Sequence, residues 1–275
     1  MLHCLNEIHG CINRKLKQAG YRCVYLTAPH ILPSLESEVR QESELKHVNE
    51  KDDSHPTKGD VSGVRKNARA WFLYSKEDYS DASTMLNQNP VEYYGIDDSY
   101  SLVENALRRE EDDHDDISST DFCAIFGFSQ GAVFCHLLSK WIHELSMHSK
   151  EEGTHFRNTE QEHNQRQHPC KRIKCSIMLG GFPSMHESNK QRKRCEHKDL
   201  ENKPIKVHSL HIIGEKDTRV PKEFGERLAN CFSDPWKYAH KKGHIIPQDS
   251  MCCQKIINFL DATRIESSRS TNNRS

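Results

Sequence analysis

Residues 121–134, DFCAIFGFSQGAVF, decide the fold that this sequence predicts. The first half is a short apolar run that closes on Gly127, as expected of a strand buried on both faces of a parallel sheet. Apolar residues of the second half and its continuation share one face of a helix: Val133, Leu137, Leu138, Trp141 and Leu145. Gly127 and Gly131 permit a sharp turn between strand and helix and leave the Ser129 hydroxyl exposed.

Three further apolar runs, each closed by Gly or Pro, are expected to be strands of the same sheet. They are residues 22–27, 174–181 and 207–214. Helical patterns lie before or after these runs, at residues 12–19, 96–107, 224–231 and 256–260. Strands that alternate with helices predict an α/β fold, with a mainly parallel sheet and helices on both faces.

Four polar segments without periodicity separate or follow these elements: residues 36–60, 146–172, 185–204 and 264–275. We expect the first three to be surface insertions in a single domain of residues 1–263, and the last to be a disordered tail. These segments account for the low hydrophobic content of the 275-residue chain, 35%, and for its mean hydropathy of -0.84. The remaining residues have the composition of an ordinary folded domain.

Charge balance and apolar run length exclude several classes of protein. With 39 basic and 40 acidic residues, the chain lacks the basic excess of a nucleic-acid-binding protein. No apolar run approaches the ~18 residues that span a bilayer, and the first residues do not resemble a signal peptide. We therefore expect a cytoplasmic protein without nucleic-acid partners, whose oligomeric state the sequence leaves open. A basic run at 190–194 could act as a nuclear-import signal, so the nucleus is an alternative location. The same run leaves a nucleic-acid adaptor open as a further hypothesis about function.

The eleven cysteines are scattered along the chain. In an intracellular protein this spacing favours free thiols over a disulfide framework. Cys170, Cys175, Cys195 and His197 are close enough in sequence to suggest zinc. Their spacing, C-x4-C followed by C-x-H, is not that of the usual structural zinc sites, so we expect no metal.

The motif GFSQG at 127–131 fits G-x-S-x-G, and a strand runs into it while a helix leaves it. This arrangement is typical of the nucleophile elbow of an α/β-hydrolase. In such an elbow the backbone N–H of the next residue, here Gln130, stabilises the oxyanion of a tetrahedral intermediate. The alternative is a glycine turn without catalytic function.

A serine hydroxyl becomes a good nucleophile only when a histidine takes its proton and an acid orients that histidine. In this fold the chain order is serine, acid, histidine. Asp217 follows the run at 207–214, and His244 lies in KGHIIP, so both fit that order. Glu215 is an alternative acid. Structural roles are also open, since an Asp after a strand is often a helix cap and the chain has 18 histidines.

Several motifs besides GFSQGA occur together and in a fixed order: RAWF at 69–72, GGF at 180–182, GEKDTRVP at 214–221 and GHIIP at 243–247. With them the sequence resembles the FSH-type serine hydrolases over about residues 8–262. That family includes the fungal family serine hydrolases and an animal esterase encoded by an ovarian-cancer-associated gene. The resemblance implies an α/β-hydrolase that cleaves carboxylic esters of acyl chains, in some members thioesters, without metal or cofactor.

The resemblance also implies roles for single residues. Three of them are catalytic: the nucleophile Ser129, the orienting acid Asp217 and the base His244. Trp71 and Phe72 are expected to line the acyl pocket, and Phe128 is counted with them as a substrate-binding residue. The alternative for Trp71 and Phe72 is packing beneath the polar loop that precedes them.

The N-terminus departs from the family pattern. Family members begin with an apolar strand and a loop that supplies a second oxyanion N–H, whereas here the helical pattern from Ile12 starts almost at Met1. We therefore expect an N-terminally truncated chain, with the first strand missing or rebuilt from residues 1–6.

The sequence therefore predicts one of two functions. The first is a serine esterase that acts on a small-molecule acyl ester or thioester through a Ser-His-Asp triad and an acyl-enzyme. The alternative is a catalytically weak binding or scaffold protein that lacks a complete oxyanion hole.

Overall fold

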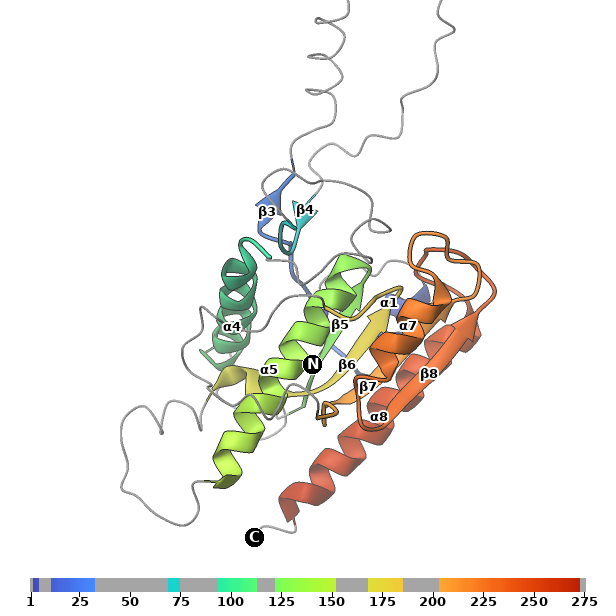
Figure 1. Ribbon diagram of the computed structural model, residues 1–275. Helices are drawn as coiled ribbons and strands as arrows, with labels where there is room; N and C mark the ends of the chain where they lie inside the picture. Colours follow the sequence, from blue (N-terminus) through green and yellow to red (C-terminus); the bar gives the residue numbers. More distant parts are fainter. Residues whose placement is uncertain are drawn as a thin grey trace, which may run out of the picture.

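A parallel sheet of six strands forms the centre of the computed structural model (Figure 1). The structure describes residues 2–4, 11–32, 69–74, 93–112, 122–151, 168–184 and 203–272. In spatial order the strands are β2 (Cys23–Tyr25), β1 (Leu2–Cys4), β5 (Cys123–Phe128), β6 (Ile173–Leu179), β7 (His208–Gly214) and β8 (Pro235–His240). All neighbouring strands are parallel, as the buried apolar runs predict.

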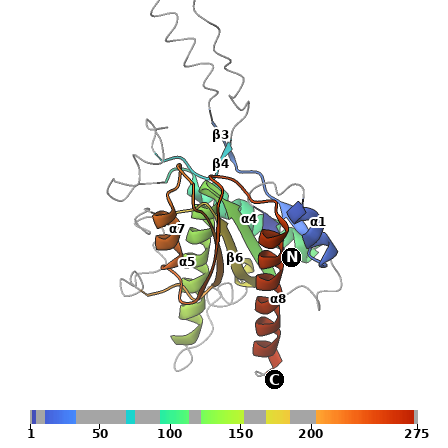
Figure 2. The same cartoon turned by 90° about the vertical axis from the view of Figure 1, so that its right-hand side faces the viewer.

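Helices cover both faces of this sheet (Figure 2). One face carries α4 (Ile96–Asp112), α5 (Gln130–Glu151) and α7 (Lys222–Ala229), and the other carries α1 (Cys11–Gln18) and α8 (Ser250–Asn272). Side chains of β5 alternate between the two resulting cores. Cys123 and Ile125 belong to the core under α5, whereas Ala124 and Phe126 belong to the core under α1 and α8. The apolar run is continuous because both faces of this strand are buried.

The predicted elements and the observed ones agree in type. The four apolar runs of the sequence overlap β2, β5, β6 and β7, and each of the five helical patterns overlaps an α-helix, although the patterns at 12–19 and 224–231 extend slightly beyond α1 and α7. The strand β8 was not predicted, because an edge strand needs no continuous apolar run. Its first residue is Pro235, and its Trp236 side chain is 41% exposed.

The prediction of a missing first strand is wrong. β1 lies between β2 and β5, where Leu2 is in register with Cys23 on one side and with Ala124 on the other. The alternative, a strand rebuilt from residues 1–6, is correct. Without β1, both neighbouring strands would present unpaired backbone groups in the middle of the sheet. Three residues are too short to show a strand pattern in the sequence.

The structure also corrects two of the predicted polar segments in part. Within 146–172, α5 continues to Glu151, and a 3₁₀ turn at Pro169–Arg172 has its Pro169 and Cys170 side chains buried. Within 264–275, α8 continues through Asn272. There the Ser267 and Ser268 hydroxyls donate to the carbonyls of Thr263 and Arg264, one turn earlier in the helix, at 2.9 and 3.0 Å.

Other predictions of chain organisation concern residues outside the described part of the chain. The segment 36–60 lies there entirely, as do residues 152–167 and 185–202. The division into a single domain of residues 1–263 stays a prediction. None of the described helices is long and apolar enough to cross a bilayer.

Two histidines are buried as neutral rings beside Phe232. The ring of His136 in α5 lies 6.0 Å from that of Phe232, and the ring of His211 in β7 lies 5.1 Å from it. Burial lowers the pKa of both histidines to about 3, and nearby lysines, Lys140 for His136 and Lys237 for His211, act in the same direction. Neither ring therefore takes up a proton until the medium is strongly acidic.

These histidines predict that the free energy of unfolding falls as the pH falls from about 6.5 toward 3. In that range the unfolded chain binds protons that the folded chain does not, so each ring costs up to about 1.4 kcal/mol per pH unit. Urea unfolding between about pH 7 and 5 measures this slope. The slope should be smaller in His211→Gln than in the wild type. Equal slopes in the two proteins would contradict the assignment.

Candidate active site

Ser129 stands between the end of β5 and the start of α5 in a left-handed backbone conformation. Its φ is 55°, and among the described residues no other non-glycine residue has a positive φ. Gly127 makes the turn possible, because a Cβ at that position would lie 2.2 Å from the carbonyl oxygen of Gly131. The Ser129 N–H donates to the Leu179 carbonyl at 2.9 Å. A non-glycine residue holds such a conformation only where its surroundings enforce it.

The hydroxyl of Ser129, the ring of His244 and the carboxylate of Asp217 form a hydrogen-bonded series. His244 Nε2 lies 3.0 Å from Ser129 Oγ, and His244 Nδ1 lies 2.7 Å from Asp217 Oδ2. Because the carboxylate can only accept, Nδ1 carries the proton, and Nε2 of the neutral ring is free to accept the serine proton. The side chains are 2% exposed for Asp217 and 10% exposed for His244, so water does not compete for the bond between them.

The second oxygen of Asp217 fixes the carboxylate. Asp217 Oδ1 accepts the backbone N–H groups of Arg219 and Val220, each at 2.9 Å. This turn leaves Oδ2 directed at the imidazole. The alternative acid Glu215 has an exposed side chain, and its backbone N–H donates to the His240 carbonyl at 2.8 Å. The geometry therefore brings Asp217, not Glu215, to the histidine.

Gly180 and Phe128 are in close contact with the imidazole of His244. Gly180 has a φ of 51°, and a Cβ there would lie 3.1 Å from His244 Cε1 and 3.4 Å from Phe128 Cε2. The Phe128 ring centroid lies 4.7 Å from that of His244. The role of Gly180 was not predicted, although the GGF motif drew attention to its position. Phe128 lies at the site, and its contact with a substrate stays a prediction.

Trp71 and Phe72 are 2% and 0% exposed, and both rings stack on aromatic neighbours in the core. The Trp71 ring lies 5.1 Å from that of Phe134, and the Phe72 ring lies 4.1 Å from that of Tyr93. Their place in an acyl pocket stays a prediction. The alternative, packing beneath the preceding polar loop, also stays a prediction, because that loop lies outside the described residues.

Gln130 is the first residue of α5, and its backbone N–H and its side-chain carboxamide have different roles. Unlike the N–H groups of Ala132 and Val133, its own N–H has no backbone acceptor among the described residues. It is one of the free donors at a helix N-terminus, where the helix dipole also favours negative charge. Its carboxamide accepts from the Trp71 N–H at 2.8 Å and donates to the Phe72 carbonyl at 2.9 Å. The GFSQG motif predicted the Gln130 N–H as an oxyanion donor, but no sequence pattern predicted these hydrogen bonds of the side chain.

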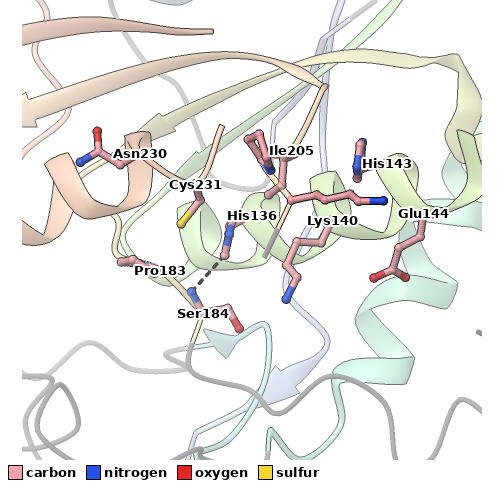
Figure 3. A pocket seen from close by; sticks show the side chains of 11 residues that line it. His136, Lys140, His143, Glu144, Pro183, Ser184, Ile205, Asn230 and Cys231 are labelled. Atoms are coloured by element: carbon pink, nitrogen blue, oxygen red, sulfur yellow. Dashed lines mark hydrogen bonds between the residues drawn. The ribbon is translucent and has the colours of Figure 1, made fainter. Parts of the chain in front are cut away.

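A hollow of about 440 Å³ lies further along α5 and is separate from this site (Figure 3). From α5 it is lined by His136, Lys140 and His143, and His136 Nδ1 accepts the Ser184 N–H at 3.0 Å. None of the three hydrogen-bonded residues Ser129, Asp217 and His244 lines it.

The zinc candidates are only partly described. Cys170 and Cys175 are buried and form no disulfide, and burial raises the pKa of Cys175. Cys195 and His197 lie outside the described residues. Within the described ranges, no group of three or more His, Cys, Asp or Glu side chains could hold a metal ion.

Comparisons with known proteins point to one family. A family model described as Serine hydrolase (FSH1) matches residues 4–256, from β1 into α8. Esterase AAEL000016 of Aedes aegypti is 26% identical over 257 residues, which cover 90% of this chain and 70% of the relative. Esterase OVCA2 of Danio rerio is 25% identical over 252 residues, or 90% of this chain and 86% of the relative. A solved carboxylesterase from Mesorhizobium loti is 10% identical, with a TM-score of 0.44 and coverage of 94% and 87%.

The left-handed backbone of Ser129 predicts an unusual order of stabilities. Because a glycine adopts positive φ without the steric cost of a Cβ, Ser129→Gly should unfold with a free energy about 1 kcal/mol higher than Ser129→Ala. At Ser146, an exposed position inside α5, the order should reverse, since alanine favours a helix over glycine by about 1 kcal/mol. Urea denaturation of the four variants tests both comparisons. If alanine is the more stable residue at both positions, Ser129 is not strained.

Proposed function

Because this chain belongs to the serine hydrolase (FSH1) family, we propose that it hydrolyses carboxylic esters of acyl chains with Ser129 as the nucleophile. The family assignment and the parallel sheet with helices on both faces make the chain an α/β-hydrolase. The observation that carries the proposal is the hydrogen-bonded series Ser129–His244–Asp217 at the carboxyl end of the sheet. The relatives named as esterases support the same reaction.

In the first half of the reaction, Ser129 Oγ attacks the carbonyl carbon while its proton passes to His244 Nε2. The tetrahedral intermediate then collapses. Its bond to the alcohol oxygen breaks, and His244 returns the proton to that oxygen, which leaves an acyl-enzyme and a free alcohol. Asp217 keeps the imidazole oriented and stabilises its positive charge while it holds the proton.

In the second half, water replaces the serine hydroxyl as the nucleophile. His244 takes a proton from water as the water oxygen attacks the acyl carbon. Collapse of the second tetrahedral intermediate breaks the bond to Ser129 Oγ, which recovers its proton from His244. The products are a carboxylic acid and the enzyme in its starting state. In both intermediates the Gln130 N–H faces the negative oxygen.

We propose a small-molecule acyl ester as the substrate, with an acyl thioester as the alternative. The same four groups serve both substrates, since a thioester differs only in its leaving group. We also place the protein in the cytoplasm, with the nucleus as the alternative, and expect no nucleic-acid partner.

The other candidate function is a catalytically weak binding or scaffold protein on the same fold. It was inferred from a missing first strand and a missing loop with the second oxyanion N–H. β1 occupies the position of that strand in the sheet, whereas residues 5–10, where the loop would lie, are outside the described residues. This function therefore stays the alternative.

A fluorophosphonate probe tests the nucleophile, because it reacts covalently with an activated serine. The wild-type protein should be labelled and should turn over p-nitrophenyl esters, whereas Ser129→Ala should do neither. Equal labelling of the two proteins would contradict the proposal. Labelling of Ser129 without ester turnover would favour the binding or scaffold function.

The acid is tested by a matched pair of amide variants. Asp217→Asn keeps the size of the side chain but no longer holds His244 in the required tautomer, so kcat should fall about 10³–10⁴-fold. Glu215→Gln, two residues earlier on the same turn, should leave kcat/KM within about twofold. Steady-state hydrolysis of a p-nitrophenyl ester measures both. A larger loss in Glu215→Gln than in Asp217→Asn would identify Glu215 as the acid.

A further inference from the structure

The segment Arg69–Tyr74, called the strap here, is fastened to three other parts of the chain. Its β4 (Arg69–Ala70) pairs antiparallel with β3 (His30–Ile31), and Arg69 Nη1 donates to the Ala28 carbonyl at 3.1 Å. Further on, Leu73 and Tyr94 exchange backbone hydrogen bonds of 2.9 and 2.8 Å. The Ser99 hydroxyl in α4 donates to the Trp71 carbonyl. The strap is therefore held from the side of α4 and from the loop after β2.

Gln130 is the group that joins this strap to α5. Its Oε1 accepts the Trp71 N–H at 2.8 Å, and its Nε2 donates to the Phe72 carbonyl at 2.9 Å. The donor and acceptor roles fix the orientation of the amide, because a flipped group would set donor against donor and acceptor against acceptor. The Trp71 ring stacks on Phe134, one turn further along α5.

The two hydrogen bonds between the Gln130 carboxamide and the strap, called the clamp here, hold the residue next to Ser129 and can therefore affect the reaction. Ser129 is held at a φ of 55°, a conformation that relaxes unless both neighbouring residues are fixed. The residue before it lies in β5, and the residue after it is Gln130, whose side chain is tied to the strap. The same residue also carries the N–H that faces the developing oxyanion.

We infer that Gln130 is a positioning residue, whose side chain uses the strap to hold Ser129 and its own N–H in the geometry that the transition state requires. The inference rests on the proposed function and adds to it a role for the carboxamide. It also gives the buried pair Trp71 and Phe72 a role through their backbone groups. Their rings and peptide groups brace the first turn of α5.

A brace of this kind acts in the transition state and not in the initial complex. Binding of the ester does not require a fixed oxyanion donor, whereas the tetrahedral transition state does. Loss of the clamp should therefore lower kcat and leave KM nearly unchanged. A loss of folded protein would instead lower the number of active sites, which phosphonate titration measures separately.

The test compares Gln130→Ala and Gln130→Glu with the wild type, with kcat expressed per phosphonate-titrated site. An ionised glutamate side chain at this position cannot donate to the Phe72 carbonyl, so we expect kcat to fall about tenfold or more in both variants, with KM within about twofold. Ser139→Ala is the control, because Ser139 is buried in the same helix and its bonds among the described residues stay within the core, to Cys135 and Ser176. It should leave kcat per site unchanged.

Ser99→Ala tests the same brace from its other end, at a residue remote from the reacting groups. It should lower kcat in the same sense, and it should add little in a Gln130→Ala background, since the strap is then no longer joined to α5. An unchanged kcat per site in Gln130→Ala, or a rise in KM at constant kcat, would overturn the inference. If Gln130→Ala does not fold, an unchanged kcat per site in Ser99→Ala would overturn the inference instead. A wild-type protein that is labelled no more than Ser129→Ala refutes the proposed function, and the inference with it.

Discussion

The left-handed backbone of Ser129 is the constraint on which the rest of the site depends. It lifts the hydroxyl above the end of β5, where a side chain in a regular strand or helix would point to one face of the sheet. The conformation is costly for a residue with a Cβ, so the parts around it must be rigid. Gly127 lets the chain turn, the Leu179 carbonyl accepts the Ser129 N–H, and the strap holds Gln130, the residue that follows Ser129.

The order of strands brings the remaining groups to this hydroxyl. Ser129 follows β5, Gly180 follows β6, Asp217 follows β7 and His244 follows β8, and these four strands are neighbours in the sheet. Because all of them are parallel, their carboxyl ends meet at one edge, although the residues lie up to 115 positions apart in the chain. Buried strands thus supply the fixed positions, and the short turns that follow them supply the chemistry.

The parts that could be predicted from sequence are those whose signal is local. A continuous apolar run closed by glycine marks a buried strand, and GFSQG between a strand and a helix marks the turn at Ser129. β8 was not predicted because it is an exposed edge strand, and β1 was predicted only as an alternative because three residues show no strand pattern. Asp217 and Glu215 lie on the same turn, and only the structure shows which of the two carboxylates points at His244. The Gln130 clamp joins residues 58 and 59 positions apart, so no local pattern reveals it.

The most direct test of the account is a crystal structure of the protein after reaction with a fluorophosphonate. The tetrahedral phosphorus resembles the intermediate of ester hydrolysis, so its oxygen shows where the oxyanion lies. We expect phosphorus bonded to Ser129 Oγ, with that oxygen about 2.7–3.1 Å from the Gln130 nitrogen and the carboxamide still bonded to the strap. Phosphorus on another residue, or an oxygen directed away from the start of α5, would contradict it.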